Sequence, residues 1–254
     1  MKISKIVLLL VILILTLPLF SIISLSFQNT NGNFYRWYEE ILADNFFLEA
    51  LGLSFIIAFI VGLLSVLLSF FLSLTWYDNK QRLYTFTTVV LIGLLPPDIL
   101  AQSISFIAQK LHLYNSNLFF LILCLVLYSL PFGILIFWTR YYFIDDIIIK
   151  SSRDLGMNKL TITTKILLPL SSSAAISTFL LCFLLSLNEY PRTFYLSGAY
   201  VFLSEYLNGK LSSGTNSSIY AGGSLTIILA IVVILIYLVY NWFTHSMKST
   251  SESK

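Results

Sequence analysis

Long apolar runs that carry almost no charge follow one another along most of this chain. Each run reaches the roughly 20 residues that a helix needs to cross a bilayer. Strands of an outer-membrane barrel are instead about 10 residues long and alternate in polarity. The sequence therefore predicts an all-α, polytopic membrane protein with six transmembrane helices. The six runs are residues 6–27, 51–76, 83–107, 118–139, 168–187 and 219–243.

The composition excludes an ordinary soluble domain. Of the 254 residues, 57% are hydrophobic and only 11% are charged, whereas soluble domains carry about 25% charged residues. No stretch between two runs exceeds about 30 residues, which is too short for a soluble domain with its own core. We therefore expect a single transmembrane domain over residues 1–254. The first run is too long for a signal-peptide core, so we interpret it as an uncleaved span.

The distribution of basic residues predicts the orientation of the chain. Six spans starting in the cytoplasm place 11 basic residues inside and four outside, as the positive-inside rule requires. We expect a multi-pass protein of the bacterial plasma (inner) membrane with both termini in the cytoplasm, and no binding of nucleic acid. The inner residues are Lys2, Lys5, Lys80, Arg82, Arg140, Lys150, Arg153, Lys159, Lys165, Lys248 and Lys254, and the outer ones Arg36, Lys110, Arg192 and Lys210.

The third run contains two adjacent prolines followed by an acid, Pro96-Pro97-Asp98. Proline lacks an amide donor and clashes with the preceding turn, but it is well placed at the start of a helix. We therefore predict a break here and a new helix that begins at Pro97-Asp98. Asp98 is a candidate for the substrate pathway, since ionisable residues at membrane depth are functional candidates. The alternative is that Asp98 only stabilises the start of the new helix.

The segment of residues 140–169 is the longest predicted cytoplasmic loop. Helical spacing of its apolar residues ends at Gly156, which occupies the position of a C-terminal cap. Asn158 can cap a second short helix, and Pro169 is placed to open the fifth span. The loop therefore predicts a helix, a glycine turn and a second helix. A plain connector needs only a few residues, so we expect this loop to dock a partner.

The spacing within this loop resembles that of binding-protein-dependent ABC importer permeases. The family pattern is Glu-Ala-Ala, three residues, Gly, nine residues, and Ile-x-Leu-Pro. This chain has Lys150-Ser151-Ser152, then Gly156, then Ile166-Leu167-Leu168-Pro169 at the same spacing. Further stretches resemble the spermidine/putrescine permeases in colinear order. They are Arg153-Asp154-Leu155-Gly156, Lys165 to Leu170, Pro97-Asp98-Ile99, Leu130-Pro131-Phe132 with Arg140, and Leu185 to Tyr190 with Phe194 to Gly198.

The resemblance implies a type I ABC importer permease fold in which this chain forms half of the pore. The loop would be a coupling helix docked on a cytoplasmic ATPase subunit dimer, and ATP would bind to those partners, so no cofactor is expected on this chain. A second homologous permease and an extracytoplasmic substrate-binding protein would complete the importer. The expected coupling residues are Lys150, Ser151, Ser152, Gly156, Ile166, Leu168 and Pro169, and the pathway candidates are Asp98, Asn188, Glu189 and Tyr190.

Two positions depart from the family pattern. Lys150 stands where relatives carry an acid, so either the ATPase partner differs or Asp145, Asp146 or Asp154 substitutes. Asn188 stands where polyamine permeases usually carry the first of two acids, which leaves Glu189 as the only charge of that pair. The expected substrates are polyamines, and the alternative is another small solute such as thiamine or ferric iron.

Enzyme chemistry finds little support in the sequence. The phosphate-binding pattern G-x-x-x-x-G-K-[ST] is absent. The two histidines, His112 and His245, fall on opposite faces of the membrane in this topology, so we expect no metal site and no Ser-His-Asp triad. Two alternatives from other classes are an intramembrane hydrolase and a stand-alone secondary transporter.

Overall fold

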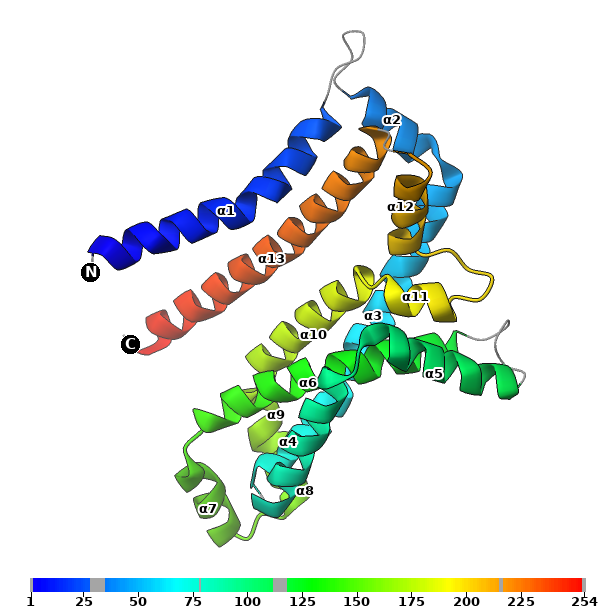
Figure 1. Ribbon diagram of the computed structural model, residues 1–254. Helices are drawn as coiled ribbons and strands as arrows, with labels where there is room; N and C mark the ends of the chain where they lie inside the picture. The colour runs from blue at the N-terminus through cyan, green and yellow to red at the C-terminus, as the bar shows by residue number, and fades with distance from the viewer. Residues whose placement is uncertain (1, 28–34, 78, 112–117, 215–216, 253–254) are drawn as a thin grey trace. The chain divides into compact units, whose positions relative to one another are not determined.

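The computed structural model describes residues 2–27, 35–77, 79–111, 118–214 and 217–252 (Figure 1). These parts of the chain are helical and contain no strand. In chain order the elements are α1 (Lys2–Ser26), α2 (Arg36–Ala43), α3 (Asn45–Ser73), η1 (Leu74–Tyr77), α4 (Asn79–Leu94), α5 (Pro97–Lys110), α6 (Phe119–Tyr142), α7 (Asp146–Asp154), α8 (Lys159–Ile162), η2 (Thr163–Leu167), α9 (Leu168–Leu170), α10 (Ser172–Leu187), α11 (Pro191–Leu196), α12 (Leu203–Ser212) and α13 (Ser217–Glu252).

All six predicted apolar runs form helices, which confirms the all-α membrane fold. Three segments are long and apolar enough to cross a membrane by themselves, namely Asn45–Tyr77, Phe119–Tyr142 and Ser217–Leu235. Two bent pairs bring the number of crossings to five. In α1 (Lys2–Ser26), the apolar part Leu10–Ser26 does not by itself meet the length of a span. The described residues thus support three to five crossings, and the predicted number of six is not confirmed.

Contacts divide the chain into two units, a division that the hydropathy pattern does not show. Unit 1 comprises Met1–Ala50 and Glu205–Lys254. Within it, α13 packs against both α1 and α2. The hydroxyl of Tyr38 lies between the hydroxyls of Ser26 and Ser224, at 2.8 and 2.7 Å. This chain of three hydroxyls joins α2 to the two long helices.

Unit 2 comprises Leu51–Ser204 and holds the predicted loop. Its centre is α6, which packs against α4, α5, α10 and α11. Small residues let the helices approach closely, because a Cβ added at Gly133 would lie 2.2 Å from the Ser69 hydroxyl and 2.9 Å from Thr178. A buried hydrogen bond of 2.6 Å joins Ser65 to Ser129. Close approach of this kind, with hydroxyls bonded between helices, is typical of membrane helix packing.

Two of the helical spans are broken. The chain bends by 95° between the segments Lys80–Gly93 and Pro97–Lys110. Because Pro97 is the first residue of α5 and Asp98 lies in its first turn, the predicted break and restart are confirmed. The second bend, of 69°, lies between Lys159–Leu170 and Ser172–Leu187.

The second bend corrects one prediction. Pro169 does not open the long fifth helix, but lies in the short helix α9, and α10 begins after Ser171. A π-helical turn, Thr163–Leu167, precedes the proline, and the amide of Leu168 reaches back to the carbonyl of Thr163. The missing amide of Pro169 interrupts the regular ladder, so the helix turns before it continues as α10.

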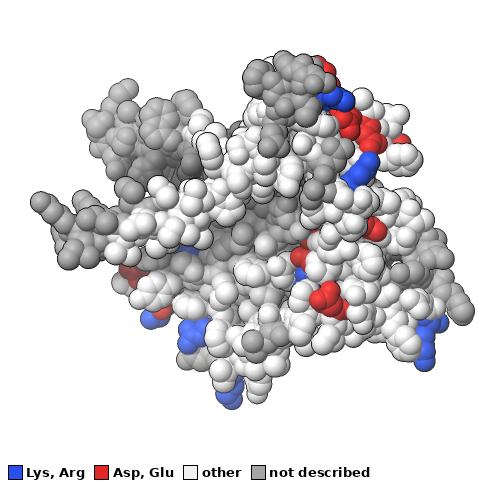
Figure 2. Space-filling model, turned by 45° about the horizontal axis from the view of Figure 1, so that its top comes forward, with Lys and Arg blue, Asp and Glu red and all other residues white. Residues whose placement is uncertain are grey.

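Charged side chains are sparse on the surface. Most of the described surface visible in Figure 2 is neither acidic nor basic. Many large apolar side chains are more than half exposed, among them Leu15, Phe20, Ile56 and Phe71 on α1 and α3. Apolar surface of this extent fits a protein whose helices face lipid.

Candidate functional site

The loop between α6 and α10 has the predicted helix, glycine turn and helix. Asp145 caps α7, because its carboxylate accepts a hydrogen bond of 2.9 Å from the amide of Ile147. Asn158 caps α8, because its side-chain oxygen accepts a bond of 2.7 Å from the amide of Thr161. Side-chain oxygens at these two positions satisfy amides that a helix start leaves open. The local sequence therefore fixes where both helices begin.

Gly156 forms the turn between the two helices. Its φ angle is +80°, which favours glycine. The amide of Gly156 donates to the carbonyl of Arg153 at 2.8 Å, and that of Met157 donates to Ser152 at 3.1 Å. This pair of bonds is the Schellman motif, which ends a helix with a left-handed residue. No atom lies within 4 Å of a Cβ built on Gly156, so the backbone angle, and not crowding, favours glycine here.

The motif residues of α7 divide between the surface and the interior. Lys150 and Ser151 are exposed, and Ser152 is buried. The Ser152 hydroxyl donates to the carbonyl of Ile148 at 2.6 Å, so no free donor remains on this side chain. Lys150 points its charge to the surface, as a contact with a partner would require.

Large apolar side chains of the loop are also exposed. The exposed fraction is 64% for Ile147, 79% for Leu155 and 74% for Leu160. A short polar loop has no internal reason to expose three such residues. Exposed apolar groups rimmed by charge are typical of interaction surfaces.

The last part of the motif lies at the π-helical turn and the bend that follows it. Ile166 is half-buried, whereas Leu168 and Pro169 are exposed. The guanidinium of Arg140, at the end of α6, donates from Nε to the carbonyl of Leu170 at 2.8 Å. This bond ties α6 to the bend between the loop and α10. Single π-helical turns are frequent at functional sites.

Three of the four predicted pathway residues, Asn188, Glu189 and Tyr190, lie at the break between α10 and α11. Glu189 is buried and its carboxylate accepts a hydrogen bond from the guanidinium of Arg192, which is 3% exposed. The guanidinium lies over the ring of Tyr128 from α6, 3.8 Å from the ring centroid. The hydroxyls of Thr193 and Ser204 donate to the Glu189 carbonyl, at 2.7 and 2.9 Å. Glu189 is therefore paired and held in place from three directions.

The neighbours of Glu189 are less constrained. Asn188 is exposed and its amide donates to the carbonyl of Leu184 at 3.0 Å. Tyr190 is half-buried and its ring lies 5.6 Å from that of Phe194. Neither residue carries a charge that could replace that of Glu189.

Asp98 lies apart from this pair, in the first turn of α5. Its side chain is exposed and forms no hydrogen bond that would cap the helix. The helix α11, which follows Glu189, packs against α5. The structure thus brings α5 and α11 together. Of the two predicted pathway acids, Glu189 is paired and Asp98 has no ion pair among the described residues.

Sequence reasoning missed Arg192 as a partner of Glu189. The spacing of three residues between an acid and a base was available as a signal, because such pairs face one another on a helix. Tyr128 carried no signal, since it comes from a helix some 60 positions earlier. Of the histidines that the hydrolase alternative requires, His112 lies outside the described residues.

Comparison with known proteins agrees with the motifs. No protein-family model matches the sequence. The chain is 25% identical over 208 residues to the spermidine/putrescine transport system permease protein PotC of Haemophilus influenzae, which covers 81% of this chain and 80% of that protein. The resemblance to ABC importer permeases, indicated by the loop spacing, is confirmed by this match.

Solved structures agree on the fold. A bacterial ABC transporter involved in the import of the acidic polysaccharide alginate matches with a TM-score of 0.66 and 15% identity, covering 96% of this chain and 95% of that chain. An amino acid ABC transporter, crystallised with histidines, matches with a TM-score of 0.61 and 11% identity, covering 80% and 96%. The chain has the fold of ABC transporter permeases.

Proposed function

We propose that this chain is one permease subunit of an ATP-driven, binding-protein-dependent importer, and that the importer carries polyamines. Residues 1–254 act as one permease domain and form half of the translocation pore in the bacterial inner membrane. A second, homologous permease forms the other half. ATP is hydrolysed on a separate cytoplasmic ATPase dimer, and an extracytoplasmic binding protein delivers the substrate. Both termini lie in the cytoplasm.

The observation that carries the proposal is the loop turn at Gly156. Its spacing to Ile166, Leu168 and Pro169 is that of the importer permeases, and the turn has the left-handed backbone that such a glycine serves. Leu155, directly before the turn, and Ile147, near the start of α7, are both exposed. The loop therefore combines a defined turn with exposed apolar side chains, which is what a groove on the ATPase would receive.

The charge of α7 bears on the ATPase partner. Lys150 and Ser151 face outward from the position where relatives carry an acid and an alanine. A lysine there would favour an acidic residue in the groove of the ATPase. Ser152 remains small and buried, so the close packing that the family pattern implies is kept.

The polyamine substrate is supported by the similarity to PotC and by the placement of acids. A desolvated amine needs a carboxylate or an aromatic face in the pathway. Because Glu189 is paired with Arg192, we assign the attraction of the amine to Asp98 and the aromatic contact to Tyr190. Asn188 adds a neutral polar group beside them.

The test is an uptake assay in cells that lack their own polyamine importers. The chain is produced together with the ATPase, second permease and binding protein encoded near it, and labelled putrescine and spermidine are measured. Gly156→Asp is the test variant, and Gly214→Asp is the matched control because Gly214 also has a positive φ with open space around it. We expect Gly156→Asp to lose ATPase association and uptake, while the Gly214 variant keeps ATPase association.

The two parts of the proposal fail separately. If the wild-type chain does not associate with the ATPase, the permease assignment is wrong. If the complex assembles and neither polyamine is taken up, the permease assignment stands and the substrate is another small solute, such as thiamine or ferric iron.

A further inference from the structure

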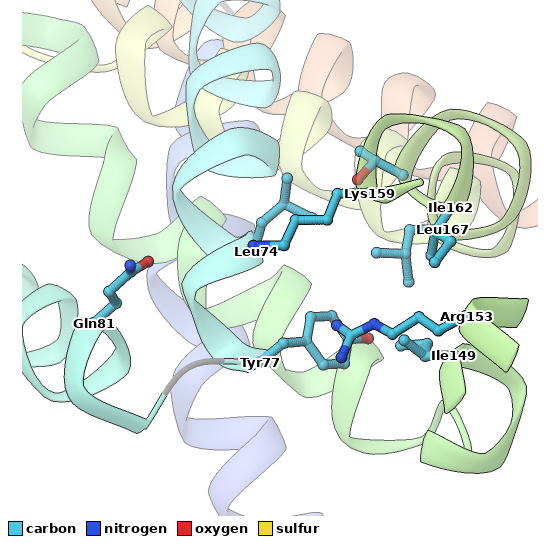
Figure 3. Close-up of a pocket in the computed structure, with 9 residues that line it drawn as sticks. Leu74, Tyr77, Gln81, Ile149, Arg153, Lys159, Ile162 and Leu167 are labelled. Carbon is cyan, nitrogen blue, oxygen red and sulfur yellow. The ribbon is translucent and has the colours of Figure 1, made fainter. Parts of the chain in front are cut away.

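A cavity of about 410 Å³ lies beside the loop, within unit 2 (Figure 3). Its walls come from the end of α3 with η1, the start of α4, and both arms of the loop. A volume of this size is within the range of small-ligand sites, about 300–1,000 Å³. The lining residues are Leu74, Tyr77, Gln81, Ile149, Arg153, Lys159, Ile162, Thr163 and Leu167.

Two positively charged side chains line the cavity, one from each of the two helices of the loop. Arg153 comes from α7 and Lys159 from α8, on either side of the Gly156 turn. Figure 3 shows both side chains extending toward η1, where Leu74 and Tyr77 lie. Within the described chain neither side chain forms an ion pair or a hydrogen bond. Asp146 lies near Tyr77 but does not line the cavity, and the lining residues include no acid. Two like charges that converge on such a lining favour an anionic occupant.

A third donor lines the same cavity. The hydroxyl of Tyr77 is buried and has no hydrogen-bond partner among the described residues. A buried hydroxyl without a partner is unfavourable unless a ligand or water satisfies it. Thr163 also lines the cavity and carries a hydroxyl. The donors therefore match a ligand with several acceptor oxygens, such as a phosphate group.

The apolar lining of the cavity and the residues next to it favour a lipid over a free ion. Leu74, Ile149, Ile162 and Leu167 give it an apolar side that an inorganic ion would not use. Next to Tyr77, the ring centroids of Trp76 and Trp138 lie 5.9 Å apart. The guanidinium of Arg82 lies 4.9 Å from the ring centroid of Trp76. Tryptophans and basic residues of this kind mark the membrane interface, at the level of the lipid headgroups.

From these observations we infer that the cavity binds the headgroup of an anionic phospholipid, with its phosphate between Arg153 and Lys159. Basic pockets between transmembrane helices bind such headgroups. The Tyr77 hydroxyl donates to a phosphate oxygen, and the apolar wall contacts the glycerol end of the lipid. Because the two cations flank Gly156, the lipid ties the end of α7 to the start of α8 and stiffens the loop.

The test measures lipid binding to the purified full chain by native mass spectrometry. Dioleoyl phosphatidylglycerol is compared with dioleoyl phosphatidylcholine and with inorganic phosphate. The test variant is Arg153→Gln/Lys159→Gln, and Lys165→Gln is the control, because Lys165 is exposed on the same loop outside the cavity. Each interfacial basic residue contributes about 1 kcal/mol toward an anionic lipid, so we expect the double variant to bind phosphatidylglycerol about thirtyfold more weakly.

Three outcomes decide the matter. Selective binding of phosphatidylglycerol that the double variant loses and the Lys165 variant keeps supports the inference. Equal binding of the two lipids, or unchanged binding by the double variant, overturns it. Displacement of the lipid by millimolar inorganic phosphate overturns the assignment to a lipid in favour of a free anion. Tyr77→Phe gives a second variant, whose weaker lipid binding would support the hydroxyl contact.

Discussion

Arg192 donates a hydrogen bond to the carboxylate of Glu189 one turn earlier in the chain, and both side chains are buried. Tyr128 covers the guanidinium from α6. A buried charge of this kind is tolerated because its partner neutralises it. An ion pair therefore links Glu189, in the break between α10 and α11, to Arg192 of α11. The Glu189 carboxylate already has this partner.

Replacing Arg192 by methionine should destabilise the protein strongly. The change leaves the Glu189 carboxylate buried without its partner, and removal of one member of a buried pair costs about 3–5 kcal/mol. The measurement is the free energy of unfolding, or the loss of helical signal with temperature, in detergent.

The control for this prediction is the double variant Glu189→Gln/Arg192→Met. It removes both charges, and we expect it to recover most of the loss, because a pair replaced by neutral groups is often tolerated. Equal stability of the wild type and the Arg192→Met variant would show that the pair does not hold the break.

Gly133→Ala should disrupt the contact between α6 and its neighbours. The added Cβ would lie 2.2 Å from the Ser69 hydroxyl, 2.8 Å from Ser69 Cβ and 2.9 Å from Thr178. Overpacking of this kind costs about 1–3 kcal/mol, which a thermal unfolding measurement resolves. Gly52→Ala is the matched control, since nothing lies within 4 Å of its Cβ. The control should be neutral or stabilising by up to about 1 kcal/mol, and equal losses in both variants would contradict the prediction.

Features set by local chemistry were predictable from the sequence. The restart at Pro97, the Asn158 cap and the Gly156 turn each depend on one residue and its immediate neighbours. The apolar runs likewise fixed where the helices lie, because only their length and polarity matter.

Features set by packing between distant segments were not predictable. Nothing in the sequence joins Tyr128 to Arg192, or Tyr77 to the loop cations, since these pairs meet only after the helices pack. The start of the fifth helix was misplaced for a related reason. Pro169 is well suited to a first helical turn, but the π-helical turn before it and the Arg140 bond after it move the long helix to Ser172.

The stability contributed by Asp44 in unit 1 should depend on pH. The hydroxyl of Tyr206 donates to its carboxylate at 2.6 Å, and this bond is the main reason why the pKa of Asp44 lies below its usual 3.8. A depressed folded pKa stabilises the protein above the pKa of the unfolded chain, and the gain disappears as the pH falls through the folded pKa. The stability lost in Tyr206→Phe should therefore be constant between about pH 5 and 7 and shrink below about pH 4.

Tyr200→Phe serves as the control, because Tyr200 is exposed. This variant should have the stability of the wild type both at neutral and at acidic pH. A difference between wild type and Tyr206→Phe that stays constant down to pH 3 would show that the hydroxyl does not act through the carboxylate.

Arg140→Met should loosen the connection between the loop and α10. The guanidinium of Arg140 donates to the Leu170 carbonyl at 2.8 Å, directly before the 69° bend. A hydrogen bond from a charged group contributes about 1.5–3 kcal/mol. The free energy of unfolding should therefore fall by about that amount. Because the bond involves neither Ile147 nor Leu155, the variant should keep its association with the proposed ATPase while uptake falls. Arg140→Lys should restore part of the loss, since it keeps the charge but not the fixed geometry of the guanidinium. A variant that loses ATPase association and uptake together would show that Arg140 shapes the contact surface itself.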